Sequence, residues 1–154
     1  MSPFDPRRGS ARVWVPASAA FLSPLRIFLE RSLEAWLGEA LVRSATEELL
    51  VAVQEAVTNV IRHAYRNGPG IVEVALDLEE RGEEAEVCVR DTGRPFDPAS
   101  VEPPDFAHPT PGGYGLHVMR CFADRCEFGR DGRTNWVRLT RRVRAASEIR
   151  AETT

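Results

Sequence analysis

The chain has 154 residues, enough for one domain with a sizeable core and too few for two. Its 20 basic and 23 acidic residues give a formal charge of −3, so the charge balance does not favour nucleic acid as a partner. All 20 basic residues are arginine. The absence of lysine excludes Schiff-base chemistry and the phosphate-binding lysine of Walker loops and eukaryotic-type kinases.

The cysteine content and the apolar runs bear on cellular location. Cys88, Cys121 and Cys126 do not form a disulfide framework. The arginines near the N-terminus are not followed by an apolar stretch of signal-peptide length. The uncharged, largely apolar run at residues 13–25 is shorter than the roughly 20 residues that cross a membrane. We therefore expect a cytoplasmic protein without a membrane partner.

The composition divides the chain into a domain and two tails. Residues 1–11 contain several prolines and arginines, and residues 143–154 are mostly polar, so we expect both to be flexible. Residues 12–142 are expected to form one domain. Within it, residues 97–112 hold five prolines and follow no periodic pattern. A loop of this length in a compact domain is typical of a lid or a binding loop.

The first half of the domain is predicted to be mainly helical. Arg12–Pro16 alternates and closes with proline, which predicts a short edge strand. Apolar residues recur at helical spacing over Ser18–Leu37. They do so again in a second helix, which we expect to begin at Ser44 or Thr46 as its cap and to run to about Tyr65.

The second half is predicted to consist mainly of hairpins. Residues 71–78 and 84–91 alternate as two strands, and residues 125–128 and 133–141 form a second pair across an Asp-Gly turn. A short helix is expected over Leu116–Ala123. Hairpins favour antiparallel pairing. The predicted class is therefore α+β: a two-layer α/β sandwich in which a mostly antiparallel sheet of four to five strands packs against three helices.

The second helix carries a possible acid–amide pair. Glu55 and Asn59 are four residues apart, so they share one stripe of the helix, and His63 follows one turn later. The amide oxygen of an asparagine suits a hard cation, and a nearby carboxylate can take a proton from a hydroxyl. The same two side chains are also ordinary on a solvated helix surface.

Asp91 continues the inward phase of its strand and is followed by Thr92 and Gly93. A buried carboxylate needs a hydrogen-bond donor, because an unpaired buried charge is expensive. The amino group of adenine would be such a donor, and Gly93 would let a base approach the backbone. The alternative is an aspartate that caps its own turn.

A glycine-rich segment, Gly112-Gly113-Tyr114-Gly115, opens the short helix at Leu116. Free backbone amides at a helix N-terminus suit phosphate oxygens. The segment is not a Walker loop, which needs a lysine followed by serine or threonine. It does not complete a Rossmann fingerprint either, since no strand directly precedes it.

These three features occur in the same order as the motifs of a known ATPase superfamily. EAVTNVIRHAY, VRDTGRPFDP and GGYGLHVMRCFAD resemble the N, G1 and G2 boxes of the GHKL ATPase superfamily. Within it, the chain is most similar to the RsbW-type anti-sigma factor serine-protein kinases, over residues 10–142. The resemblance implies a Bergerat-type sandwich that binds ATP or ADP with Mg²⁺ beneath a lid.

The resemblance also implies roles for single residues. Asn59 would ligate magnesium, Asp91 would bind the adenine amino group, and Gly93 would line the base channel. Glu55 would be the catalytic base that deprotonates a serine hydroxyl of a partner protein. The implied nucleotide-binding residues are Asn59, His63, Asp91, Gly93, Gly112, Gly113, Tyr114, Gly115 and Leu116.

The family's partners are a sigma factor, which it sequesters, and a STAS-domain anti-anti-sigma protein, which it phosphorylates on serine. Homodimers are common in this family, whose members regulate transcription in stress responses. A second hypothesis is an ATP-gated partner-binding or switch regulator with little or no kinase activity. A third, the detached catalytic domain of a histidine kinase, is disfavoured because His63, His108 and His117 all lie within or near the boxes.

Some assignments stay open at the level of sequence. Arg62, Arg94 and Arg120 lie near the boxes and are candidates for phosphate contact, although each also suits a plain surface. In many GHKL proteins a threonine of the closing strand reaches the adenine site. Here Thr134, Thr140 or neither fills that place.

Two further features of the C-terminal part have simple structural explanations. Trp136 alternates with the apolar residues of its strand and is predicted on the opposite face, where it would suit an interface. His117, Cys121 and Cys126 supply only three ligands at a spacing that fits no common zinc pattern. We expect these residues to fill the core.

Overall fold

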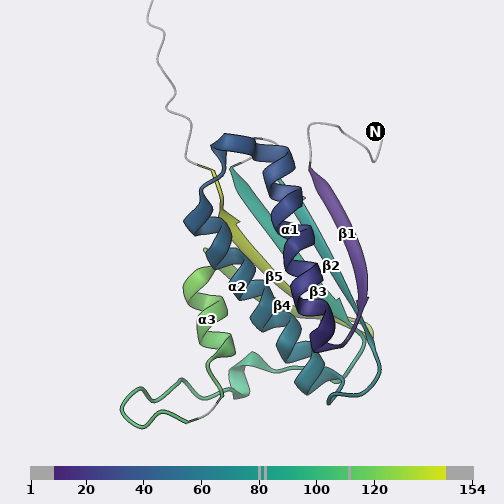
Figure 1. The fold of residues 1–154 in the computed structure, drawn as a ribbon. Helices are drawn as coiled ribbons and strands as arrows, with labels where there is room; N and C mark the ends of the chain where they lie inside the picture. Colours follow the sequence, from purple (N-terminus) through teal and green to yellow (C-terminus); the bar gives the residue numbers. More distant parts are fainter. Residues whose placement is uncertain (1–8, 80, 82, 111, 145–154) are drawn as a thin grey trace, which may run out of the picture.

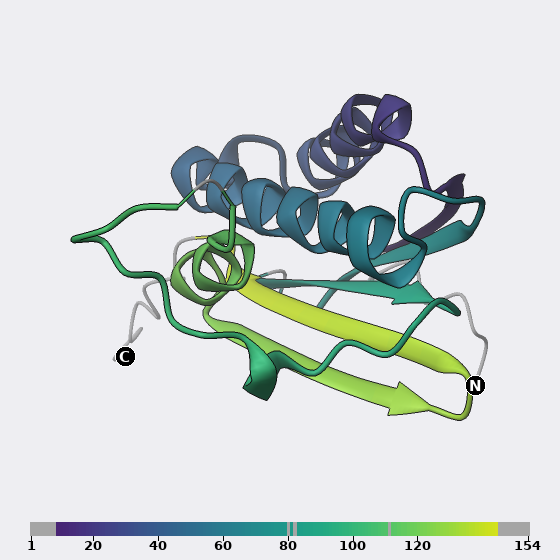
Figure 2. The same cartoon turned by 90° about the horizontal axis from the view of Figure 1, so that it is seen from below.

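The computed structural model describes residues 9–79, 81, 83–110 and 112–144. The expected tails fall mainly outside this part, at residues 1–8 and 145–154. In this part of the chain, three α-helices lie on one face of a single β-sheet, and Figures 1 and 2 show this two-layer arrangement from perpendicular directions. Both the predicted class and the two-layer architecture are confirmed.

Among the described residues, the sheet has five strands, and every neighbouring pair is antiparallel. Their order across the sheet is β1-β2-β3-β5-β4, so β1 is an edge strand as predicted. Strand β1 begins two residues before the predicted boundary, inside the segment expected to be flexible. The strands are β1 (Ser10–Pro16), β2 (Ile71–Leu78), β3 (Glu84–Asp91), β4 (Arg125–Asp131) and β5 (Thr134–Arg142).

The helices begin and end close to the predicted boundaries. The second helix differs from the prediction in its cap and in the π-helical turn at its end. Helix α1 spans Leu22–Leu37 after a short 3-10 turn η1 (Ala19–Phe21), and α3 spans Gly115–Phe122. Helix α2 spans Arg43–Asn59 and continues as one turn of π-helix, η3 (Val60–Ala64). Two more 3-10 turns are η2 (Gly38–Ala40) and η4 (Pro98–Ser100).

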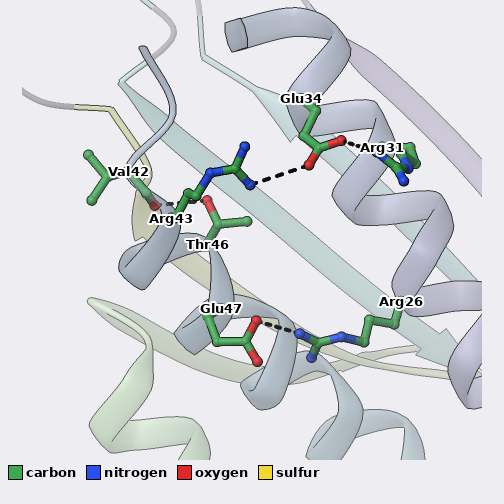
Figure 3. A network of polar contacts seen from close by, with 7 residues as sticks. All are labelled: Arg26, Arg31, Glu34, Val42, Arg43, Thr46 and Glu47. Atoms are coloured by element: carbon green, nitrogen blue, oxygen red, sulfur yellow. Dashed lines mark hydrogen bonds and ion pairs between the residues drawn. The ribbon is translucent and has the colours of Figure 1, made fainter. Parts of the chain in front are cut away.

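The predicted cap of α2 is wrong. The residue before the helix is Val42, whose side chain cannot cap it. Thr46 lies inside the first turn, where its hydroxyl donates to the Val42 carbonyl at 3.0 Å (Figure 3). Ser44 is likewise inside the helix. Hydroxyl side chains often bond back to the preceding turn in this way, so their presence alone does not mark a helix start.

The core lies between the sheet and the helices and follows the predicted alternation. The inward residues of β2 and β3 are fully buried, and Asp91 continues their phase at the end of β3 with 7% exposure. The helices contribute leucines and small apolar residues at 3.6-residue spacing. The fully buried side chains include Leu29, Leu33, Leu49, Val53, Val72, Val74, Leu76, Val87, Val89, Met119 and Leu139.

Ion pairs join α1 to the start of α2 on the solvent side (Figure 3). Arg26 pairs with Glu47 across the two helices. The carboxylate of Glu34 in α1 forms ion pairs with Arg31 at 2.8 Å and with Arg43 of α2 at 3.5 Å. Exposed pairs of this kind contribute at most about 1 kcal/mol each. The packing of the two helices therefore depends on their buried leucines more than on these charges.

The remaining sequence expectations have mixed outcomes. Cys126 packs against the core, but Cys121 is exposed on α3, so core filling is wrong for that thiol. Its sulfur lies 3.4 Å from Nε2 of His117. Trp136 is on the sheet face opposite the helices, where its ring covers Gly129 of the neighbouring strand. Among the described helices, none has the length and apolar character needed to cross a bilayer.

Candidate functional site

A cavity lies where the C-terminal end of α2 faces the end of β3 and the start of β5. About 480 Å³ of space not filled by protein atoms lies here, including the part that is open to solvent. Asn59, His63 and Asp91, three of the predicted site residues, line it. The other lining residues are mostly apolar: Ala56, Val60, Ala64, Arg94, Phe96, Met119, Phe128, Gly129, Asn135, Trp136 and Val137.

Asp91 is the carboxylate at the base of this cavity. Its Oδ1 accepts hydrogen bonds from the Gly93 amide at 2.9 Å and from Asn135 Nδ2 at 2.8 Å. The first bond is the self-capping turn that the sequence left open as an alternative. No described residue donates to Oδ2, and the side chain borders the cavity. Oδ1 therefore caps the turn, and binding of a ligand donor at Oδ2 stays a prediction.

Gly93 holds the turn after β3 against the end of α2. A Cβ at this position would lie 2.5 Å from the Ala64 carbonyl oxygen, so only glycine fits without moving the backbone. The same carbonyl accepts a hydrogen bond from the Arg94 amide at 2.9 Å. Gly93 is absent from the cavity lining within the described residues. Its close approach is therefore to the helix.

The π-helical turn η3 and Tyr65 complete this junction. In η3 the Tyr65 amide reaches back five residues, to the Val60 carbonyl, and π turns are frequent at functional sites. The Tyr65 hydroxyl donates to the Ile71 carbonyl at 2.8 Å and accepts from the Thr92 amide at 3.0 Å. Sequence patterns place Tyr65 only at a helix end, because its partner Thr92 is 27 residues away in the chain.

Glu55 and Asn59 of α2 meet the start of α3. A Cβ on Gly115 would lie 2.9 Å from Glu55 Oε2 and 3.4 Å from Asn59 Oδ1. The glycine therefore lets the α3 backbone approach both polar side chains, which are half-buried. Two motifs that are separate in sequence, the acid–amide pair and the glycine-rich segment, are adjacent in space.

The residues of the glycine-rich segment differ in backbone conformation and in burial. Gly112 and Gly113 have φ of 90° and 81°, a left-handed conformation that favours glycine. Both are exposed, and neither lies in the lining of the described cavity. Tyr114 precedes the first residue of α3. Leu116 is buried, so its side chain packs in the core.

The segment between β3 and α3 projects beyond α3 (Figure 2). Within this segment, Phe106 packs against Tyr114 and, edge to face, against His117, with ring centroids 6.1 and 5.3 Å apart. His108 hydrogen-bonds to Asp105 at 3.0 Å, which lowers the pKa of that carboxyl from its ordinary value. The aromatic contacts of Phe106 therefore connect the segment to α3.

A second recess adjoins the cavity and is lined by basic side chains. It is bordered by Arg62, His63, Arg66, Arg94 and Pro95. Two of the three predicted phosphate-contacting arginines, Arg62 and Arg94, lie here. His63 and Arg94 border both the recess and the cavity.

The third predicted arginine, Arg120, is exposed on α3 and borders neither space. Within the described ranges, no ion pair involves any of the three arginines of the recess. Their charges are therefore available to an anion.

Asn135 is the main residue that the sequence analysis missed. It lies directly across from Asp91 in the β3–β5 pairing and is 9% exposed. Thr134 pairs with Asp131 in the hairpin to β4, and Thr140 is buried near the other end of β5. Neither threonine borders the cavity. Only the register of β5 against β3 identifies Asn135, and sequence alone does not give that register.

Comparisons with known proteins agree with this architecture. The family described as histidine kinase-like ATPase domain matches residues 15–141. The serine/threonine-protein kinase BtrW of Bordetella bronchiseptica is 30% identical over 104 residues, covering 65% of this chain and 71% of BtrW. The serine-protein kinase RsbW of Staphylococcus aureus is 34% identical over 89 residues, covering 54% of this chain. That match spans only half, 50%, of the RsbW sequence.

Solved structures show the same fold. A crystal structure of RsbU and RsbW domains from Mycobacterium tuberculosis superimposes with a TM-score of 0.64 at 17% identity. The match covers 89% of this chain and 33% of that one. The histidine kinase domain of a blue-light activated kinase from Erythrobacter litoralis gives a TM-score of 0.52, also at 17% identity, covering 84% and 62% of the two chains.

Proposed function

Because the chain belongs to the histidine kinase-like ATPase family, in the group that includes BtrW and RsbW, we propose that it is a Mg-ATP-dependent serine-protein kinase and anti-sigma factor. The observation that carries the proposal is the meeting of Glu55, Asn59 and the Gly115 backbone beside the cavity that holds Asp91. This arrangement supplies a purine acceptor, a cation ligand and a base in one continuous site.

The purine of ATP is placed in the cavity, with its amino group toward Asp91 Oδ2. The apolar lining, including Val60, Met119 and Phe128, suits the faces of a base. The phosphates then extend toward Asn59 and the N-terminal end of α3. Backbone amides at that end favour phosphate oxygens, and Gly115 lets them approach.

The donor set fits magnesium. Asn59 Oδ1 and Glu55 Oε2 both lie close to the Cβ position of Gly115, and amide and carboxylate oxygens are the ligands that hard cations prefer. We assign Asn59 as the protein ligand of Mg²⁺. When bound, the ion would neutralise charge on the phosphates during transfer.

Glu55 is proposed to accept the proton of the attacking serine hydroxyl. Phosphoryl transfer depends mainly on positioning and charge neutralisation, so a single well-placed base is sufficient protein chemistry. The lysine-free chain is expected to neutralise phosphate charge through Arg62 and Arg94 of the basic recess. The segment at residues 97–112 is proposed to act as the lid over the nucleotide.

The proposed partners are those that the resemblance to RsbW-type kinases implies. We propose a sigma factor, which the protein sequesters, and a STAS-domain anti-anti-sigma protein, whose serine it phosphorylates. A cytoplasmic homodimer is the form we expect in solution. The second candidate function is an ATP-gated binding protein with little transfer activity. Glu55 favours the kinase, because a pure binding module does not need a carboxylate one turn before the cation ligand.

The deciding experiment incubates this protein with γ-labelled ATP and a STAS-domain protein whose gene lies near the gene for this chain. The wild type should label a serine of that protein, and Glu55→Gln should lose labelling while still binding ATP in calorimetry. Glu39→Gln, an exposed carboxylate removed in the same way, is the matched control and should label normally. Equal labelling by the wild type and Glu55→Gln would exclude Glu55 as the base, and ATP binding without any labelling would favour the binding module.

A further inference from the structure

Asn135 joins the cavity to the hairpin between β4 and β5. Its Nδ2 lies 2.8 Å from Asp91 Oδ1, 3.1 Å from the Gly93 carbonyl and 3.3 Å from the Arg94 carbonyl. Its Oδ1 accepts from Arg130 Nη1 at 3.0 Å. The amide is thus bonded on both sides, in a place that is more than nine-tenths buried.

The partners on both sides of Asn135 fix which way its amide points. A guanidinium only donates hydrogen bonds, so the amide oxygen must face Arg130, and the Asp91 carboxylate only accepts, so the NH₂ group must face Asp91. Arg130 also donates from Nε to the Gly132 carbonyl at 2.9 Å. The hairpin turn therefore supports the orientation in which Asn135 donates to Asp91.

This polarity decides what Asp91 offers to a ligand. Its Oδ1 is occupied by the donors of Gly93 and Asn135, and Oδ2 is left to the cavity as an acceptor. A purine with an amino group at C6 can donate to that oxygen. A purine with a carbonyl at C6 would place its oxygen against a carboxylate, which is unfavourable.

We propose that Asn135 is a positioning residue that fixes Asp91 for a 6-amino purine and so gives the site its preference for adenine over 6-oxo purines. The inference rests on the proposed nucleotide-binding function and adds the origin of its base selectivity. In the register of β5 against β3, the closing-strand residue that donates to Asp91 is Asn135, and neither Thr134 nor Thr140 borders the cavity.

The test uses three triphosphates with different groups at C6: ATP with an amino group, purine riboside triphosphate with hydrogen, and ITP with a carbonyl and a hydrogen on N1. Their affinities are measured by calorimetry for the wild type and for Asn135→Leu, which keeps the volume and removes the donor. We expect the ratio of ATP affinity to 6-hydrogen affinity to fall about 10-fold, as for a lost hydrogen bond to a charged group. Affinity for the 6-hydrogen probe should change little.

Two more variants separate positioning from folding. Asn135→Thr keeps a hydroxyl donor and should recover part of the preference for ATP. Arg130→Met leaves Asn135 in place but releases its amide, so the ratio should fall in the same direction by a smaller factor. Arg133→Ala, an exposed arginine of the same hairpin, is the control and should match the wild type. If Asn135→Leu does not fold, Arg130→Met and Asn135→Thr decide the question.

The outcomes distinguish this inference from the proposed function. A wild type that binds no triphosphate would overturn both. A wild type that prefers ATP, with the same ratio in Asn135→Leu and Arg130→Met, would overturn only the role of Asn135. An equal loss for all three triphosphates would also overturn it, because a purely structural role weakens every ligand alike.

Discussion

Replacing Gly115 by alanine should separate catalysis from folding. The added methyl group would lie 2.9 Å from Glu55 Oε2, whereas ordinary contacts begin near 3.4 Å, so the carboxylate must retreat by about 0.5 Å. This movement is inexpensive for the fold, since the displaced atom ends a flexible side chain. Alanine also favours helix by up to about 1 kcal/mol over glycine. The free energy of unfolding should therefore stay the same or rise slightly.

The transfer rate should respond much more strongly than stability. A misplacement of about 1 Å in an active site can cost about 100-fold, so half of that should lower the rate roughly 10-fold. The assay follows labelling of the STAS-domain protein under single-turnover conditions, with urea unfolding and ATP binding measured on the same samples. Cys121→Ala, an exposed change on the same helix, is the control. A transfer rate within twofold of the wild type would refute the assignment of Glu55 as the base.

Two other predictions address the fold and the thiols. Gly93→Ala should lower the free energy of unfolding by about 2 kcal/mol, because the new Cβ would lie 2.5 Å from the backbone oxygen of Ala64. Urea denaturation measures this change, and a loss below about 0.5 kcal/mol would contradict the prediction. Burial raises the pKa of Cys126 to about 11 and also raises that of Cys88, so at pH 8 N-ethylmaleimide should modify exposed Cys121 first. Mass spectrometry of a short reaction should show one adduct, lost in Cys121→Ser, and equal labelling of all three cysteines would contradict the burial.

Much of the fold was predictable because its signals are local. The alternation of residues 71–78 and 84–91 gives both strands with their correct boundaries, and places Asp91 on the buried face. The helical period gives α1 and α3 within a few residues. These patterns depend on which face of an element is buried, and burial is recorded directly in the order of apolar residues.

The site could be predicted only in part, because its geometry depends on pairing between distant segments. The π turn η3 has no distinct sequence signal, since Val60–Ala64 also fits an α-helix. Asn135 is one polar residue among several in its strand and gains its role from lying across from Asp91. Gly93 illustrates a different limit: its sequence context suggested approach to a ligand, and its nearest neighbour is the backbone of Ala64.

The π turn connects three parts of the proposed site. It begins directly after Asn59, and its last carbonyl, that of Ala64, accepts from the Arg94 amide and contacts Gly93. The proposed cation ligand, the turn that Asp91 caps and one arginine of the basic recess are therefore positioned relative to the same five residues. Conversion of this turn to a regular α-helix would rotate Ala64 relative to Asn59. The proposed base-binding and phosphate-binding parts of the site would then shift together.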